Sequence, residues 1–330
     1  MFFSVIIPVY NRPDEVDELL ESLTAQSEKS FEIIIVEDGS QVKSEHIVQQ
    51  YATTLNMRYI EKPNSGPGLS RNEGANYASG DYLIFFDSDC IIPPNYFRHV
   101  LHFLQKNPVD AFGGPDNALP TFTTVQKAIN YSMTAFFTTG GIRGKKKAMD
   151  KFYPRSFNLG VSKKAFEAIG GYGTMRFGED IDFSLRLIKY GFTTAFIPEA
   201  FVYHKRRTDF KKFFKQVYNS GIARINLHIS HPGSMKAVHL LPSLFTVTMM
   251  IFILSGIFIF PYSLLIPLLY SLLIFADAVL KNKSTKVGLY AVVASWVQLF
   301  GYGMGFIVAA WRRLLFKGGE FKAFEKKFYN

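Results

Sequence analysis

Three apolar stretches near the C-terminus constrain the fold of this chain more than any other feature. They cover residues 240–260, 262–280 and 287–311, which is 21, 19 and 25 residues, and Asp277 is their only charged side chain. A helix needs about 20 apolar residues to cross the hydrocarbon core of a bilayer. Helices of a soluble domain would also show a polar face, and these stretches have none. We therefore predict membrane segments within residues 238–312.

Basic residues flank two of these stretches and bear on their orientation. Lysines follow the second stretch and mainly arginines follow the third: Lys281, Lys283, Lys286, Arg312, Arg313 and Lys317. By the positive-inside rule both clusters should be cytoplasmic, and 313–330 would be a basic cytoplasmic tail. Three full spans would separate the clusters. The conflict disappears if one segment is re-entrant, and the third, interrupted by Gly301, Gly303 and Gly305, is the candidate.

Charge and cysteine content narrow the cellular setting. Residues 1–140 hold nine Lys and Arg against 17 Asp and Glu, a net −8, whereas residues 141–330 hold 28 against 10, a net +18. Because the positive residues flank apolar runs, this asymmetry favours an anionic membrane surface over nucleic acid. The single cysteine, Cys90, excludes an internal disulfide and fits a reducing compartment. The N-terminus does not resemble a signal peptide, so we expect the first domain to be cytoplasmic.

The first half of the chain alternates strands and helices. Continuous apolar runs at 4–9, 32–36 and 81–86 are typical of strands buried on both faces. Helical periodicity between them, as in Val16, Leu19, Leu20 and Leu23, completes a βαβαβ order. This order predicts an α/β, Rossmann-like doubly wound sheet, with ligands at the carboxyl ends of the strands. We expect one globular domain over residues 1–230.

Two later segments have a different pattern. Residues 113–144 lack clear periodicity and end in a lysine run, which is typical of a functional loop. Residues 208–228 interleave Phe210, Phe213 and Phe214 with lysines. That pattern predicts a basic amphipathic helix at a membrane interface, ending the globular domain.

Two carboxylates follow the predicted strand at 81–86. Asp87 and Asp89, separated by Ser88, would project in the same direction at the ligand-binding edge of the sheet. Carboxylates so placed repel each other unless a cation lies between them. Mg²⁺ commonly uses one or two carboxylates together with phosphate oxygens of a substrate. We predict a metal and diphosphate site here, with Asp89 the direct ligand, over the alternative of an ordinary polar turn.

Other strand ends and a glycine turn are expected to line the same edge. Asp38 follows the second buried strand, where its carboxylate can accept from a nucleotide base or a ribose hydroxyl. Pro8, Tyr10 and Asn11, at the end of the first strand, would form the neighbouring wall. The turn at Gly66 precedes Arg71, so that backbone N–H groups and a guanidinium would face an anionic ligand.

A third acidic group opens a predicted helix. Glu179, Asp180 and Asp182 fall within four residues. Negative charge at a helix start is favourable, so capping explains one of them but not all three. A carboxylate left over can act as a general base toward a hydroxyl. We assign this role to Asp180, ahead of the other two, which would lie near the acceptor. His204 is a candidate third metal ligand, although a lone histidine is commonly structural.

Together these residues resemble the family-2 inverting glycosyltransferases, which have a nucleotide-binding A-type fold. Five motifs in family order carry the resemblance over residues 3–230: SVIIPVYNR (4–12), EIIIVEDGS (32–40), GPGLSRNEGANYASGDYLIFFDSDC (66–90), NLGVSKKAFEAIGGY (158–172) and GEDIDFSLRLIKYG (178–191). The resemblance implies that Asp38 contacts the base, that Asp87 and Asp89 bind the donor diphosphate through Mg²⁺ or Mn²⁺, and that Asp180 is the catalytic base.

The C-terminal half resembles membrane-anchored members that build succinoglycan-type exopolysaccharide or O-antigen units on polyprenyl lipids. Processive synthases of the family carry a Gln-x-x-Arg-Trp motif, but Gln216 is followed by VYNSGIAR. The resemblance therefore implies addition of a single sugar from a nucleotide sugar to a lipid-linked or saccharide acceptor, at the inner (plasma) membrane. Two rival readings are a polyprenyl-phosphate sugar transferase and a non-catalytic membrane assembly protein.

Overall fold

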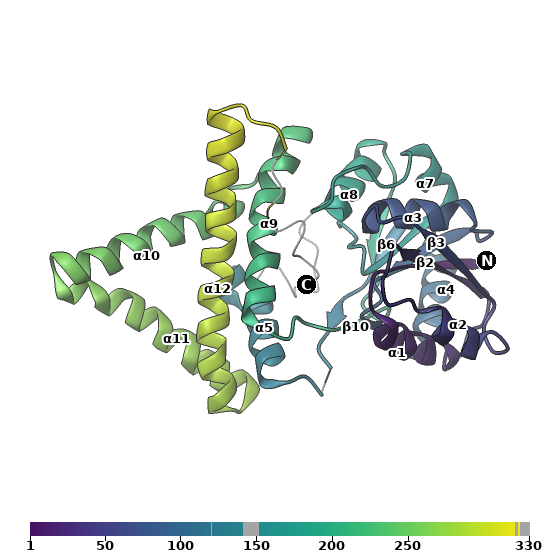
Figure 1. Cartoon of the computed structure of the whole chain (residues 1–330), viewed down its shortest axis with the longest axis horizontal. Helices are drawn as coiled ribbons and strands as arrows, with labels where there is room; N and C mark the ends of the chain where they lie inside the picture. Colours follow the sequence, from purple (N-terminus) through teal and green to yellow (C-terminus); the bar gives the residue numbers. More distant parts are fainter. Residues whose placement is uncertain (120, 141–151, 321–322, 324–330) are drawn as a thin grey trace. The chain divides into compact units, whose positions relative to one another are not determined.

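The structure is a computed structural model that describes residues 1–119, 121–140, 152–320 and 323. The chain forms two compact units (Figure 1). The first comprises Met1–Leu119 with Lys146–Lys205, and the second comprises Pro120–Lys145 with Arg206–Asn330. Each unit is described separately below.

The first unit is built on a seven-stranded sheet in the order β3-β2-β1-β4-β8-β6-β9. Its strands are β1 (Phe3–Val9), β2 (Phe31–Asp38), β3 (Met57–Lys62), β4 (Tyr82–Phe86), β6 (Ala111–Gly113), β8 (Asn158–Ser162) and β9 (Thr194–Phe196). The first four strands are parallel, and β8 runs antiparallel to β4 and β6. This topology confirms the predicted α/β, Rossmann-like fold.

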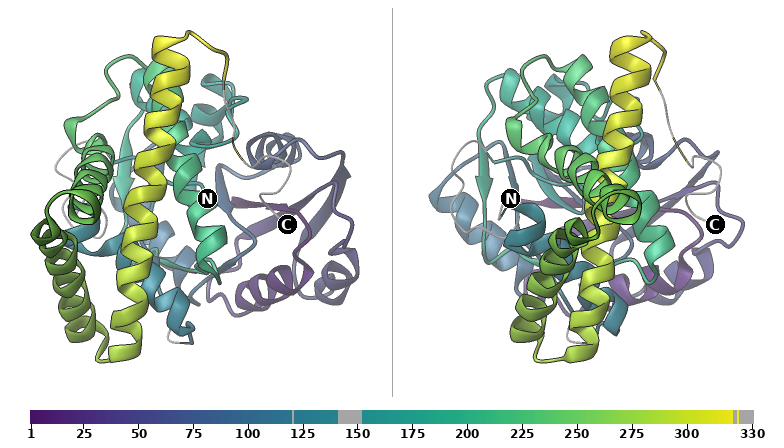
Figure 2. Two further views of the ribbon diagram at one scale, coloured as in Figure 1. Left: turned by 60° about the vertical axis from the view of Figure 1, so that its left-hand side comes forward. Right: turned by 90° about the vertical axis from the view of Figure 1, so that its left-hand side faces the viewer.

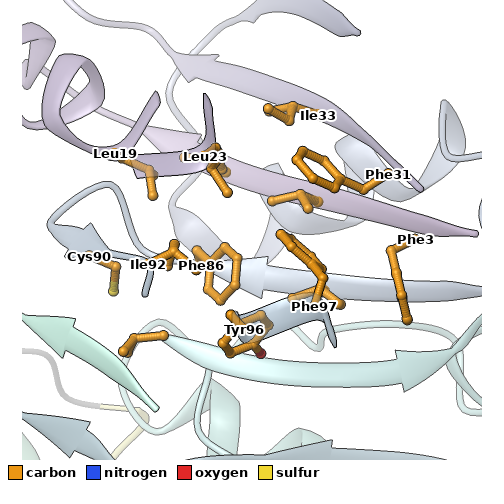
Figure 3. Packing of buried hydrophobic residues seen from close by; sticks show 14 of the residues in the cluster. Phe3, Leu19, Leu23, Phe31, Ile33, Phe86, Cys90, Ile92, Tyr96 and Phe97 are labelled. Atoms are coloured by element: carbon orange, nitrogen blue, oxygen red, sulfur yellow. The ribbon is translucent and has the colours of Figure 1, made fainter. Parts of the chain in front are cut away.

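Alternate residues of the central strands supply the two cores of this unit. Val5 and Ile7 of β1 pack with α1 (Pro13–Thr24) and α4 (Tyr96–Lys106), whereas Ile6 belongs to the opposite cluster. This alternation follows from the two-residue period of a strand. Figure 3 shows the first cluster, in which the rings of Phe31 and Phe97 stack with centroids 4.4 Å apart. The second face is covered by α3 (Pro67–Asn76), α7 (Lys163–Ala168) and α8 (Glu179–Lys189). A further helix, α2 (Glu45–Tyr51), precedes β3.

A small second sheet, in the order β5-β10-β7, lies in the same unit. It pairs β5 (Cys90–Ile91) antiparallel with β10 (Val202–His204), and β10 parallel with β7 (Asp116–Asn117). In this register His204 lies opposite Cys90. Residues more than 100 positions apart in the sequence are therefore brought to the end of β4.

The second unit is helical. It contains α5 (Thr124–Thr134), α6 (Phe136–Thr139), α9 (Phe210–Ser230), α10 (Leu241–Phe258), α11 (Leu265–Asn282) and α12 (Thr285–Ala310), with the short elements η1 (Ala237–His239), η2 (Pro261–Leu264) and η3 (Trp311–Leu315). Three of its helical segments are long and apolar enough to cross a membrane, judged by length and composition: Ala237–Phe258, Pro261–Asn282 and Thr285–Leu315. The three predicted apolar segments are thus helical throughout most of their length.

The compact units do not divide where the sequence analysis placed the boundary. Helix α9 was predicted to end a globular domain at residue 230, but it is grouped with the apolar helices because Val217 and Gly221 pack on α12. The prediction of an irregular loop at 113–144 was wrong for its middle part, which forms the helices α5 and α6. A capping box stabilises the start of α5, with Thr123 and Gln126 bonded to each other's backbone N–H. The lysine run at 145–147, which ends that predicted loop, lies outside the described residues.

Candidate active site

The two acidic residues that follow β4 have different partners. Asp87 Oδ1 lies 2.6 Å from Nη2 of Arg71. Asp89 is 9% exposed; its Oδ1 lies 3.0 Å from Nε2 of His204 and its Oδ2 lies 3.2 Å from Nη1 of Arg12. The fold therefore gives the two carboxylates different partners: Asp87 belongs to a buried ion-pair network, and Asp89 to a carboxylate–imidazole pair.

The Asp89–His204 pair fits a divalent cation. Oxygen and nitrogen donor atoms of Asp89, His204 and the sulfur of Cys90 all lie within 4.8 Å of one another. Carboxylate and neutral imidazole are common ligands of Mn²⁺ and related metals. Cys90 fits less well, because burial and the neighbouring Asp89 raise the pKa of its thiol and keep it protonated. We therefore regard Asp89 and His204 as the residues of this group best suited to hold a metal.

Arg71 is fully buried and joins two parts of the site. Its guanidinium contacts Asp87 on one side and Glu179, at 3.4 Å, on the other, and it stacks over the ring of Tyr172 at 5.3 Å. Burial alone would lower the pKa of Arg71, but the neighbouring Asp87, Tyr172 and Glu179 raise it, so the guanidinium stays charged. With 2% of its surface exposed, Arg71 is a buried partner of Asp87 and Glu179. The predicted contact between Arg71 and an anionic ligand stays a prediction.

The three acidic residues at the start of α8 differ in their surroundings. Burial and the adjacent Asp180 raise the pKa of Glu179 to about 7. Asp180 Oδ2 lies 2.6 Å from Nε of Arg155. Asp182 Oδ2 accepts from Nε and Nη2 of Arg186, at 3.0 and 2.8 Å. Asp182 thus has a structural partner on its own helix, and Asp180 is the carboxylate of this group whose partner, at 41% exposure, is the most accessible to solvent.

Asp38, at the end of β2, organises the loop that leads into α3. Its Oδ1 accepts from the backbone N–H of Ser65 at 2.8 Å and from Lys62 Nζ at 2.5 Å, and its Oδ2 accepts from the N–H of Gly66 at 2.9 Å. Gly66 has φ +93°, a conformation that glycine adopts without strain. Asp38 is 4% exposed, so its predicted contact with a nucleotide stays a prediction.

The end of β1 braces the neighbouring loop, and the predicted contact of its residues with a nucleotide sugar stays a prediction. Pro8 pairs with Val36 in the sheet register, the half-buried Tyr10 follows the strand, and Asn11 has φ +54°. Asn11 Oδ1 accepts from the backbone N–H groups of Gln41 and Val42, at 2.8 and 3.0 Å. The loop that follows β1 is thereby tied to the loop that follows β2.

Ser88 lies between the two carboxylates that follow β4 and is itself buried. Its position between two candidate ligands makes Ser88 a candidate for the donor-binding group. Its predicted contact with a nucleotide sugar stays a prediction.

Two arginines of the site were missed by the sequence analysis. Arg12 contacts Asp89, and Arg155 contacts Asp180. Arg12 lay within a quoted motif, SVIIPVYNR, and a basic residue at a strand end was an available signal. Arg155 lies in a stretch without periodicity, and its approach to Asp180 depends on the antiparallel placement of β8, which no local pattern indicates.

The chain matches the family model described as "Glycosyl transferase family 2" over residues 4–170. It is 33% identical over 218 residues to an uncharacterized glycosyltransferase of Haemophilus influenzae, covering 62% of this chain and 69% of the relative. It is 28% identical over 213 residues to the minor teichoic acid biosynthesis protein GgaB of Bacillus subtilis, covering 63% of this chain but 23% of that protein.

A solved structure is similar over most of the chain. It is the mannosyltransferase PcManGT from Pyrobaculum calidifontis in complex with GDP-Man and Mn2+, with a TM-score of 0.65, 15% identity, and coverage of 90% of this chain and 86% of that one. At this identity the likeness shows the fold. The family model covers half of this chain and includes Asp38, Asp87 and Asp89. The chain therefore belongs to glycosyl transferase family 2 and is a glycosyltransferase with the A-type fold.

Proposed function

We propose that the chain is a metal-dependent, inverting glycosyltransferase that moves a single sugar from a nucleotide sugar to a lipid-linked or saccharide acceptor in cell-surface polysaccharide synthesis. The observation that carries the proposal is the network centred on Arg71. This buried cation joins Asp87, beside the proposed metal ligand Asp89, to Glu179, beside the proposed base. The donor and acceptor halves of a transfer site are thereby held at fixed positions within one unit.

The donor half is proposed to lie over the strand ends. Asp89 and His204 would hold the metal, and Asp87 would hold the ribose or reach the metal through water. A bound Mg²⁺ or Mn²⁺ supplies positive charge that stabilises the departing diphosphate. Solved structures of similar fold contain GDP-Man with Mn2+ in PcManGT and UDP-GlcNAc in Staphylococcus aureus TarS, which supports a nucleotide-sugar donor here.

The acceptor half is proposed to lie at the start of α8. Asp180 accepts the proton of the attacking hydroxyl, whose oxygen forms the new bond to the anomeric carbon as the bond to the diphosphate breaks. Inversion follows from this single displacement. Arg155, now 2.6 Å from Asp180, must yield space to the hydroxyl. Glu179 and Asp182 lie beside the proposed base at the start of α8.

Donor binding tests the proposal first. We expect one nucleotide sugar of a panel to raise the unfolding temperature of the purified chain with Mn²⁺ but not with EDTA, because a ligand at 100 times its Kd stabilises by about 2.7 kcal/mol. The matched control is Asp89→Asn, which should lose the shift. Equal shifts with and without metal would contradict metal-dependent donor binding.

The rival polyprenyl-phosphate sugar transferase differs in its acceptor. Offered the preferred donor, the enzyme should glycosylate a lipid-diphosphate sugar and leave a bare lipid phosphate unchanged, as judged by mass spectrometry of the product. Transfer to the bare phosphate would establish the rival function. A non-catalytic assembly protein would give neither product. The intact acidic residues of this chain count against that possibility.

A further inference from the structure

Helices α10 and α11 form a V whose two arms stand on α12 (Figure 1). Near the start of α10, Thr246 Oγ1 donates to the carbonyl of Leu299 in α12 at 3.2 Å. Near the end of α11, Val279 packs so closely on α12 that a Cβ at Gly288 would lie 2.4 Å from its side chain. At the tip, Gly256 packs on Leu264. The hairpin therefore leaves α12 and returns to it.

Helix α12 is accompanied along its length by α9, which runs parallel to it. The contacts are Phe210 with Tyr290 at a centroid distance of 6.1 Å, Tyr218 O against Gly305, and Arg313 hydrogen-bonded to Asn226. Figures 1 and 2 show the two helices side by side. Helix α9 carries Lys211, Lys212, Lys215 and Arg224. If α12 crossed the bilayer, these four cations would enter the hydrocarbon, which is strongly unfavourable.

The dimensions of the hairpin are too small for a full crossing from an interfacial α12. Each arm has 18 residues, or about 27 Å at 1.5 Å per residue. The arms contact α12 near Gly303 and Gly288, which are 15 residues or about 22 Å apart on that helix. The tip of such a triangle lies about 25 Å from the axis of α12, less than the roughly 30 Å of a hydrocarbon core.

The tip has the composition and hydrogen bonding of a segment inside hydrocarbon. Phe258, Ile259, Phe260 and Tyr262 are 77%, 82%, 55% and 70% exposed within the chain. Their backbone is bonded internally: the N–H groups of Ile259 and Phe260 both donate to Ser255 O, at 2.8 and 2.7 Å. Internal pairing is what a chain reversal requires in lipid, whereas water would expose these aromatic side chains unfavourably.

We propose that α10–η2–α11 is a re-entrant hairpin that enters a lipid bilayer from one side and ends within it, while α9 and α12 lie together in the interface on that side. Lys281, Lys283 and Lys286, at the foot of α11, then lie on the same side as Arg312 and Arg313, which removes the orientation conflict found in the sequence. The re-entrant part is the first two apolar segments and not 287–311, the candidate favoured by the sequence. This topology goes beyond the proposed chemistry and does not depend on it.

Cysteine labelling in sealed membrane vesicles of both orientations tests the topology. Single cysteines are introduced into the full chain at four exposed positions. The substitutions are Ala25→Cys in the first unit, Thr285→Cys at the start of α12, Gly319→Cys after η3, and Tyr262→Cys at the tip. The native Cys90 is buried, so the unmodified protein is the unlabelled control. An impermeant maleimide should label the first three from one common side and Tyr262→Cys from neither. Labelling of Thr285→Cys and Gly319→Cys from opposite sides, or of the tip from the far side, would overturn the proposal.

Fluorescence depth measurement provides a second, independent test that needs no labelling chemistry. The chain has two tryptophans, Trp296 and Trp311, both at the C-terminal side of the hairpin. With both replaced by phenylalanine and Tyr262→Trp introduced, lipids brominated deep in the acyl chain should quench the tip most strongly. In the Trp296→Phe variant, Trp311 should be quenched most by shallow bromines. Strongest quenching of the tip by shallow bromines indicates a full crossing, and no quenching indicates that protein, such as a second copy, covers the tip; either result refutes the proposal.

Discussion

At the scale of single residues, the site depends on how one buried arginine divides the acidic groups. Arg71 draws Asp87 and Glu179 toward itself, while Asp89 faces His204. A carboxylate that is paired with a buried guanidinium is fixed in direction. The two acidic residues that contact Arg71 are thereby distinguished from Asp89, which has His204 and Arg12 as partners.

Replacing this arginine should destabilise the first unit. Arg71→Met leaves the carboxylates of Asp87 and Glu179 without their buried cation, and we expect the free energy of unfolding to fall by about 3 kcal/mol, the lower end of the usual range for a broken buried pair, because Asp87 is partly exposed. Chemical denaturation in detergent measures this loss. Arg58→Met, at an exposed site over Tyr77, is the control and should change stability by less than about 0.5 kcal/mol. Equal effects of the two substitutions would contradict the role given to Arg71.

Glu179 should make stability depend on pH. Its pKa of about 7 lies above the ordinary value of 4.5, so the folded state binds the proton more tightly than the unfolded state. The resulting stabilisation is complete below pH 4.5 and is lost as the pH rises to about 7. In EDTA, the midpoint temperature of unfolding should decrease as the pH is raised from 5 to 8. The midpoint of the Glu179→Gln variant should decrease less over the same interval. An unchanged slope in Glu179→Gln would show that another group is responsible.

The residues at strand ends could be predicted because their position follows from the chain alone. Asp38 and Asp87 come directly after buried apolar runs, and parallel strands bring such residues to one edge. The direction of Arg71 could not be predicted in this way. Its partners lie 16 and 108 residues away, and its burial depends on the packing of Tyr172. The sequence predicted that Arg71 belongs to the site, but it did not predict that its side chain is buried.

At the scale of elements, close helix packing holds the second unit together. Gly221, Gly301 and Gly305 allow α9 and α12 to approach at backbone distance: a Cβ at Gly305 would lie 2.1 Å from Tyr218 O, and one at Gly221 would lie 2.2 Å from Tyr302 O. Small residues permit such approach between helices in membrane proteins. The glycines that seemed to interrupt the third apolar segment are therefore its packing surface.

A methyl group at this surface should loosen the unit. Gly305→Ala forces a backbone shift of α9 or α12. We expect the free energy of unfolding to fall by about 1–3 kcal/mol, as is usual for overpacking. Gly319→Ala is the matched control, since a Cβ at that position would have no atom within 4 Å among the described residues. The midpoint of thermal unfolding in detergent reports the difference. If Gly305→Ala unfolds at the temperature of the control, α9 and α12 are not packed as described.

Several elements were predictable from the sequence, and helix α5 was the clearest failure. Strands β1, β2 and β4 and helix α9 agree closely with their apolar periodicity. Helix α5 was missed because its buried side includes Gln126, Tyr131 and Ser132, so its pattern does not look apolar. The capping box formed by Thr123 and Gln126 was the available signal.

At the scale of the whole molecule, a glycosyltransferase unit is joined to a helical unit with three segments of membrane-spanning length. Length and composition predicted this combination. They could not predict which segment is re-entrant, because that depends on the partners of each helix: Arg313 of the second basic cluster bonds to Asn226 of the amphipathic helix, a contact invisible in hydropathy.

Sugar transfer by the whole enzyme should depend on a bound divalent metal. Chelation with EDTA should abolish sugar transfer, and Mn²⁺ or Mg²⁺ should restore it. Loss of the imidazole at position 204 should raise the metal concentration needed for half-maximal activity by at least about tenfold, because a ligand has been lost. His99→Ala, at an exposed position of α4, serves as control and should titrate like the unmodified enzyme. Full activity in EDTA would exclude a metal-dependent transfer.

The most direct measurement compares sugar transfer with donor binding in Asp180→Asn. If Asp180 is the general base, kcat should fall on the order of 10³-fold, while the Kd of the donor, measured by calorimetry with Mn²⁺, should change by less than about threefold. Asp182→Asn, next to Arg186 on the same helix, is the control and should keep most of its turnover. Near-normal turnover in Asp180→Asn would contradict the account at its centre.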